Sequence, residues 1–116
     1  MELKTEKLGN VTVITLSGKL ITEASQDLKD GLYAHCESGP GHMLIDMKDV
    51  SYVSSYLIGV LVGCHKLLKK SGCDLHLSGL SPQLRMVLKV SGLTEIFPNH
   101  ETREEGLEYF DTTTTA

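Results

Sequence analysis

Two adjacent serines, Ser54 and Ser55, lie where a strand-like segment meets an apolar, helix-like segment. In an α/β sheet this junction is the carboxyl end of a strand, where functional residues tend to lie. A serine here can cap the helix by accepting a hydrogen bond from a first-turn N–H, which contributes about 1 kcal/mol. It can also accept a phosphoryl group, since the positive end of a helix dipole favours a phosphate with about two negative charges. The spacing of the two serines does not distinguish capping from phosphorylation. Because serine caps are common at helix starts, the residues alone favour capping.

Two aspartates, Asp46 and Asp49, form a second candidate site beside the expected end of a central strand. Paired carboxylates at such a place could exchange protons with a substrate or bind Mg²⁺. A solvated turn is the simpler interpretation, because aspartate readily occupies turns.

The thiols and imidazoles give a weaker signal. Three cysteines, Cys36, Cys64 and Cys73, are an odd number without CxxC spacing, which argues against a disulfide framework and a structural zinc site. Cys64 and His65 are neighbours that point to different faces of a helix, so they are not expected to share a metal. We therefore expect buried cysteines, histidines on the surface, a reducing compartment and no metal site.

Enzyme signatures do not occur in the chain. There is no GxSxG, GxxxxGK[ST], GxGxxG or HExxH, so we expect neither an enzyme nor a bound cofactor. A small cysteine- or metal-dependent enzyme is the alternative from a different class, motivated by the scattered cysteines and the five histidines.

The first elements that must position these residues are a hairpin and a helix. Residues 3–8 and 11–16 read as two strands around a Gly9-Asn10 turn, with the second strand ending at residues 17–18. Thr22 can cap a following helix, whose apolar residues recur every four positions from Ala24 to Cys36.

Alternating strands and helices follow. Residues 43–45 are a continuous apolar run typical of a central strand, and residues 57–68 predict an apolar helix stopped by Gly72. A half-buried strand is expected at 73–77, a helix capped by Ser81 and closed by Gly92, and at most a stub of strand at 96–97. A capping box at residues 102–105 opens a last short helix.

This order predicts an α/β fold: a single domain over residues 1–111 with a four- to five-stranded mixed sheet covered by about four helices. Residues 112–116, mostly threonine, are expected to form a disordered tail.

Composition limits the range of functions. The 116 residues suit one domain, with 41% hydrophobic and 22% charged residues, as in ordinary globular proteins. The net charge of -4 and the lack of a basic block make nucleic acid a poor partner. The N-terminus has no apolar signal segment, and the most apolar run, residues 56–64, is too short for a bilayer. We expect a cytoplasmic protein with no direct membrane insertion.

Three segments resemble a known family. LIDMKDVSYVSSYLIGVLVG (44–63) resembles the central segment of STAS domains, the anti-sigma factor antagonist family, in which a strand ending in Asp leads to a D-S-S/T-G-L-G motif. LSGLSPQLRMVLKVSGLTEIFP (77–98) is similar to the second signature of that family, and GKLITEASQDL (18–28) to its first helix entry. The likeness runs from about Leu8 to Tyr109 with the segments in the right order.

The resemblance implies a small regulator that is not an enzyme. Family members bind an anti-sigma factor, often itself a serine kinase, and are released when the motif serine is phosphorylated; a phosphatase reverses the switch. Laid onto this chain, the phosphoacceptor is Ser55, with Ser54 competing. The implied partner-binding residues are Ser54, Ser55, Tyr56, Leu57 and Ile58.

The chain departs from the family pattern at three positions. Ser54 replaces the Asp before the phosphoacceptor, Leu57 replaces the following Gly, and Ile21 replaces an Asp at the entry to the first helix. Leu57 adds bulk where a partner backbone would approach closely. A scaffold subunit of a signalling or transport assembly that is not phosphorylated is therefore the alternative function.

Overall fold

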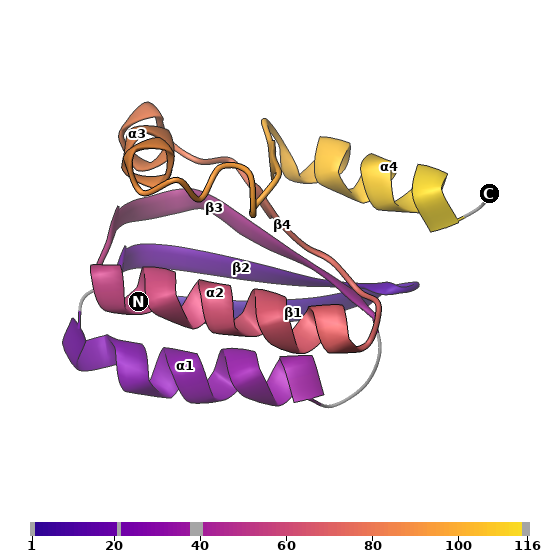
Figure 1. The fold of residues 1–116 in the computed structure, drawn as a ribbon, viewed down its shortest axis with the longest axis horizontal. Coiled ribbons are helices and arrows are strands. Elements are labelled where there is room, and N and C mark those ends of the chain that lie inside the picture. The colour runs from indigo at the N-terminus through magenta and orange to yellow at the C-terminus, as the bar shows by residue number, and fades with distance from the viewer. Residues whose placement is uncertain (1, 21, 38–40, 115–116) are drawn as a thin grey trace.

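A computed structural model describes residues 2–20, 22–37 and 41–114, which form one five-stranded sheet in the order β1-β2-β3-β4-β5 (Figure 1). The strands are β1 (Glu2–Leu8), β2 (Val11–Leu20), β3 (His42–Val53), β4 (Leu75–Ser78) and β5 (Asn99–His100). β1 pairs antiparallel with β2, and every later pair is parallel. The mixed sheet and the N-terminal hairpin are thus confirmed.

Helices cover both faces of the sheet. The described helices are α1 (Thr22–Glu37), α2 (Ser55–Lys70), α3 (Pro82–Val90) and α4 (Arg103–Thr114). α1 and α2 lie side by side on one face, α4 lies over the other, and α3 sits at one end of the sheet (Figure 1). The predicted α/β architecture with about four helices is correct.

β3 is the central strand, buried from both sides, as its apolar run predicts. Met43 and Ile45 belong to the larger core beneath α1 and α2, whereas Leu44 belongs to a smaller core with Val13 and Phe110 under α4. Successive side chains of a strand point to opposite faces, so this single strand serves both cores.

Several boundaries differ from the sequence expectations. β3 continues through Val53, so Asp46 and Asp49 lie within the strand and do not flank its end. β2 extends to Leu20, and the last short strand is Asn99–His100, not residues 96–97. β4 is buried at all four positions and is not half-buried, because α4 covers its second face. Strand pairing and distant helices decide these features, and local propensity does not report them.

The C-terminal helix α4 reaches Thr114, three residues into the segment 112–116, while residues 115–116 lie outside the described part of the chain. No helix within residues 2–20, 22–37 and 41–114 is long and apolar enough to cross a membrane.

Three predicted helix ends are confirmed, while the predicted cap at Thr22 depends on a side chain outside the described part of the chain. Ser81 Oγ accepts a hydrogen bond from Leu84 N at 3.2 Å, and Thr102 Oγ1 accepts one from Glu105 N at 3.1 Å. Gly72 has φ +73°, and Cys73 N donates to Leu68 O at 2.9 Å, which closes α2 with a left-handed glycine.

Gly63 sets the approach of α1 to α2. A Cβ at this position would overlap the hydroxyl oxygen of Tyr33 on α1. The glycine therefore lets the two helices come close together at the level of Cys64, the next residue.

Candidate functional site

Ser54 caps α2 at the end of β3. Its backbone is extended, with φ −76° and ψ 158°, and its Oγ accepts a hydrogen bond from Leu57 N at 3.2 Å. The residue is only 6% exposed. The capping role that the sequence offered to either serine is thus taken by Ser54.

Ser55 is the first residue of α2, and its side chain is exposed to solvent. The first turn of α2 carries no acidic residue, so no carboxylate of that turn opposes a negative group at this end. The partial positive charge of a helix N-terminus favours an anion here. The structure therefore separates the two serines: Ser54 is buried and bonded, and Ser55 is accessible at an end that suits a phosphate.

The next three residues divide between surface and core. Tyr56 is 39% exposed and Ile58 is half-buried, whereas Leu57 has no exposed area and packs in the larger core. The added bulk of Leu57 therefore lies inside the protein. Among the expected partner-binding residues 54–58, the structure exposes mainly Ser55 and Tyr56.

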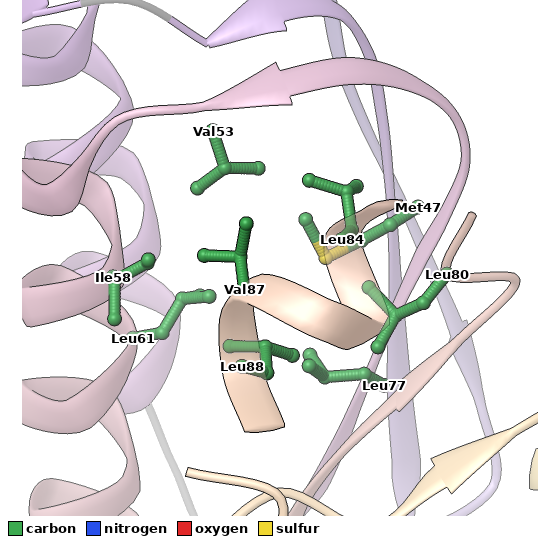
Figure 2. Close-up of a pocket in the computed structure, with 9 residues that line it drawn as sticks. All are labelled: Met47, Val53, Ile58, Leu61, Leu77, Leu80, Leu84, Val87 and Leu88. Carbon is green, nitrogen blue, oxygen red and sulfur yellow. The ribbon is translucent and has the colours of Figure 1, made fainter. Parts of the chain in front are cut away.

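A shallow apolar groove lies beside this helix start, between α2 and α3. Figure 2 shows Val87 and Leu88 of α3 facing Ile58 and Leu61 of α2, with Val53 at the end of β3 nearby. The groove holds about 10 Å³, room for no more than a water molecule. The two helices are thus packed together, and a partner would meet their outer surface.

The outer face of α3 is apolar and exposed. Met86 is 58% exposed, Val87 42% and Val90 79%. Residues three and four apart share one face of a helix, so Met86 and Val90 form an outward strip, which Val87 borders on the side of α2 (Figure 2). We call Ser55, Tyr56 and Ile58 together with Met86, Val87 and Val90 the α2–α3 surface.

Sequence reasoning missed this strip, although a signal was present. Two of the nine residues of α3, Leu84 and Leu88, are buried in the core, and they lie on one face of the helix because they are four positions apart. Met86, Val87 and Val90 are apolar residues left over after that face is assigned. Surplus apolar residues on a short helix indicate an interaction surface when they cluster.

The two aspartates lie within β3 and not at its end, and both line one open pocket together with Lys48 and Arg103. Asp46 is 4% exposed, and its Oδ1 accepts a hydrogen bond from Lys48 N at 3.2 Å, whereas Asp49 is exposed. Within the described residues, no three His, Cys, Asp or Glu side chains are grouped so that they could hold a metal ion.

The cysteines are buried as expected, but the expectation of surface histidines is wrong for His76. His76 is 4% exposed, and its Nδ1 lies 2.9 Å from Nε2 of His100. Tyr109 and Phe110 of α4 pack against its ring at 4.9 and 4.5 Å between centroids. Burial and the neighbouring His100 lower the pKa of His76 to about 4, so the neutral ring is the buried form.

Comparison with protein families gives one match: the STAS domain model covers residues 2–106. The anti-sigma-B factor antagonist of Bacillus subtilis (strain 168) is 32% identical over 95 residues, which cover 82% of this chain and 86% of that protein.

Two solved structures have a similar fold. SpoIIAA, an anti-sigma factor antagonist, in its unphosphorylated form has a TM-score of 0.84 at 21% identity, covering 96% of this chain and 97% of that one. The phosphorylated form of the Bacillus cell fate determinant SpoIIAA has a TM-score of 0.75 at 22% identity, covering 94% and 99%. At these identities the likeness supports the fold alone.

Proposed function

Because the chain belongs to the STAS domain family, we propose that it is an anti-sigma factor antagonist regulated by reversible phosphorylation of Ser55. In this proposal it acts in the cytoplasm as a regulator and not as an enzyme. Its partners are an anti-sigma factor with serine kinase activity and a phosphatase that restores the free hydroxyl.

One observation carries the choice of Ser55: its side chain is exposed at the N-terminus of α2, while the hydroxyl of Ser54 is buried and bonded to Leu57 N. A kinase must reach the hydroxyl that it modifies, and Ser54 would have to give up its cap first. The sequence similarity to an anti-sigma-B factor antagonist at 32% identity supports the class of partner.

The anti-sigma factor would bind the α2–α3 surface. Exposed apolar residues on α3 supply area whose removal from water favours association, at about 25 cal/mol per Å². Ser55 and Tyr56 are exposed at the start of α2, two or three residues before Ile58, which faces α3 (Figure 2), and would lie at the rim of the contact.

Phosphorylation would disfavour this complex through charge. A phosphate changes the net charge of the protein from -4 to about -6. Moving that charge into a packed apolar interface costs on the order of several kcal/mol unless the partner pairs it. The free phosphoprotein, in contrast, keeps the phosphate in water at the favourable end of α2.

The experiment is phosphorylation by the cognate kinase with ATP, followed by peptide mass spectrometry and binding measurements. We expect one phosphate on Ser55, none in Ser55→Ala, and at least tenfold weaker binding of the anti-sigma factor by Ser55→Asp. Ser71→Asp is the matched control, since Ser71 is an exposed serine at the other end of α2. It should bind like the wild type.

The alternative function is a scaffold subunit that is not phosphorylated. It is favoured by Ser54, which stands where the family has an Asp and whose hydroxyl is engaged by the helix cap. If Ser55 takes up no phosphate and Ser55→Asp retains full affinity, the scaffold function replaces the switch.

A further inference from the structure

Two buried thiols lie together between α1 and α2. Cys36 is in the last turn of α1, and its Sγ is 4.0 Å from the carbonyl oxygen of Cys64 on α2. The neighbouring Cys64 thiol lowers the pKa of Cys36, whereas the Cys36 thiol and burial raise the pKa of Cys64. The two side chains are therefore direct neighbours, although 28 positions separate them in the sequence.

The close approach of the two helices brings these thiols together. Gly63 precedes Cys64, and a Cβ at Gly63 would overlap the hydroxyl oxygen of Tyr33. Both cysteines belong to the larger core, with Cys64 fully buried and Cys36 6% exposed. The packing holds the pair in one place, and Cys36 is the member nearer to solvent.

The third cysteine is engaged elsewhere. Cys73 Sγ accepts a hydrogen bond from Gly41 N at 3.2 Å and lies 3.6 Å from Ser71 O. It is as buried as Cys36, at 6% exposed, so it offers a matched control for burial.

We propose that Cys36 and Cys64 are a redox modification site, which closes to an intramolecular disulfide between α1 and α2 on exchange with a small-molecule disulfide. The thiolate of Cys36 attacks one sulfur of the small disulfide, forms a mixed disulfide and releases one small thiolate. The Cys64 sulfur then attacks the Cys36 sulfur and expels the second small thiolate, which takes up the proton of Cys64 and leaves as a thiol. Two protein thiols are oxidised to one disulfide, and the small disulfide is reduced to two thiols.

The order of the two steps follows from the positions of the sulfurs. Cys36 reacts first because it is the less buried of the two cysteines and its pKa is lowered, which raises its thiolate fraction. Cys64 has no exposed area, so it cannot meet the small disulfide directly. In this packing it can react only with the mixed disulfide on its neighbour Cys36. A nucleophilic thiol beside a resolving thiol is the arrangement that favours a disulfide over further oxidation.

The site would link the helix that carries Ser55 to its neighbour α1. Cross-linking residues 36 and 64 removes conformational freedom from the unfolded chain, so the oxidised protein should be more stable. This inference does not depend on the proposed function, because it concerns the covalent state of the chain and not a partner.

The test uses the full, folded chain with oxidised glutathione as the disulfide. After the excess glutathione is removed, the chain is unfolded so that every remaining thiol, buried ones included, is alkylated, and intact mass and non-reduced peptides are measured. Before alkylation, we expect the oxidised chain to be about two mass units lighter than the reduced chain. After alkylation, it should carry a single alkyl group, on Cys73. The peptide that contains Cys36 should be linked to the peptide that contains Cys64. The thermal midpoint should rise and return to its original value on reduction.

Variants and denaturant provide the controls. Cys73→Ala should give the same linked product, whereas Cys36→Ala and Cys64→Ala should give none. In concentrated urea the wild type should form all pairings of its three cysteines, since the packing that selects one pair is lost. Three alkylated thiols in the folded wild type, a glutathione adduct that never resolves, or a link to Cys73 would each overturn the proposal, whether or not the variants fold.

Discussion

Ser54 Oγ accepts the backbone N–H of Leu57 at 3.2 Å, and this bond decides the roles of the two adjacent serines. It buries one hydroxyl as a helix cap and leaves the next residue, Ser55, facing solvent at the start of α2. The cap and the proposed phosphorylation site are thus distinct residues that share one helix end.

Loss of the cap should destabilise the protein. We expect Ser54→Ala to lower the free energy of unfolding by about 1–2 kcal/mol, because a buried Leu57 N–H loses its acceptor. Ser81→Ala removes a bond of the same 3.2 Å length at the start of α3, where the site is only partly buried, and should cost less. Urea denaturation of both variants measures the difference; an equal or smaller cost for Ser54→Ala would contradict the structural role given to its burial.

Two glycines of α2 should respond oppositely to the same substitution. Gly59→Ala meets nothing within 4 Å, so the gain in helix propensity should stabilise the protein by up to about 1 kcal/mol. Gly63→Ala places its methyl group against the Tyr33 hydroxyl and should destabilise it. Thermal unfolding of the pair measures the contrast, and a stable Gly63→Ala would mean that α1 and α2 are not held as close as the structure has them.

Acid should destabilise the contact between α4 and β4 through His76. The pKa of His76 is lowered to about 4 by burial and by His100, while an unfolded histidine titrates near 6.5. Between pH 4 and 6.5 the unfolded chain therefore binds more protons than the folded chain. The contribution of neutral His76 to the free energy of unfolding is complete above pH 6.5 and is lost as the pH falls toward 4. The loss amounts to roughly 3 kcal/mol at most, by the size of the shift.

Denaturation measured from pH 7 to 4 tests this effect. His76→Phe keeps an aromatic ring in the cluster and should flatten the pH dependence in this range. Tyr109→Phe, which keeps the aromatic ring that packs against His76, should retain the pH dependence. The same steep loss of stability in His76→Phe would assign the effect to other groups.

The apolar strip of α3 should matter for partner binding and not for folding. Val90 is 79% exposed, so Val90→Glu should leave the free energy of unfolding within about 0.5 kcal/mol. The same change should weaken binding of the anti-sigma factor at least tenfold, because it places a charge in the proposed interface. Leu8→Glu, at a 38% exposed apolar residue of the hairpin, is the control and should bind normally. Isothermal titration calorimetry measures the affinity of each variant for the anti-sigma factor. Equal affinities of Val90→Glu and Leu8→Glu would contradict the role of α3 in the interface.

The sequence predicted the features that depend on near neighbours in the chain. The hairpin turn, the cap at Ser81 and the stop at Gly72 are fixed by interactions over a few residues, so residue type and order suffice. The alternation of strands and helices and the resemblance of residues 44–63 to a known motif then indicated the fold and the region of the site.

Tertiary packing decided the features that depend on distant residues. β3 is long because β2 pairs along it, His76 is buried because α4 covers β4, and Cys36 meets Cys64 because α1 packs on α2. For the cap of α2, the residue types alone gave Ser54 and Ser55 equal claims. Only the packing around Leu57, which buries one hydroxyl and exposes the other, distinguishes them, since burial is a property of the assembled layers and not of local sequence.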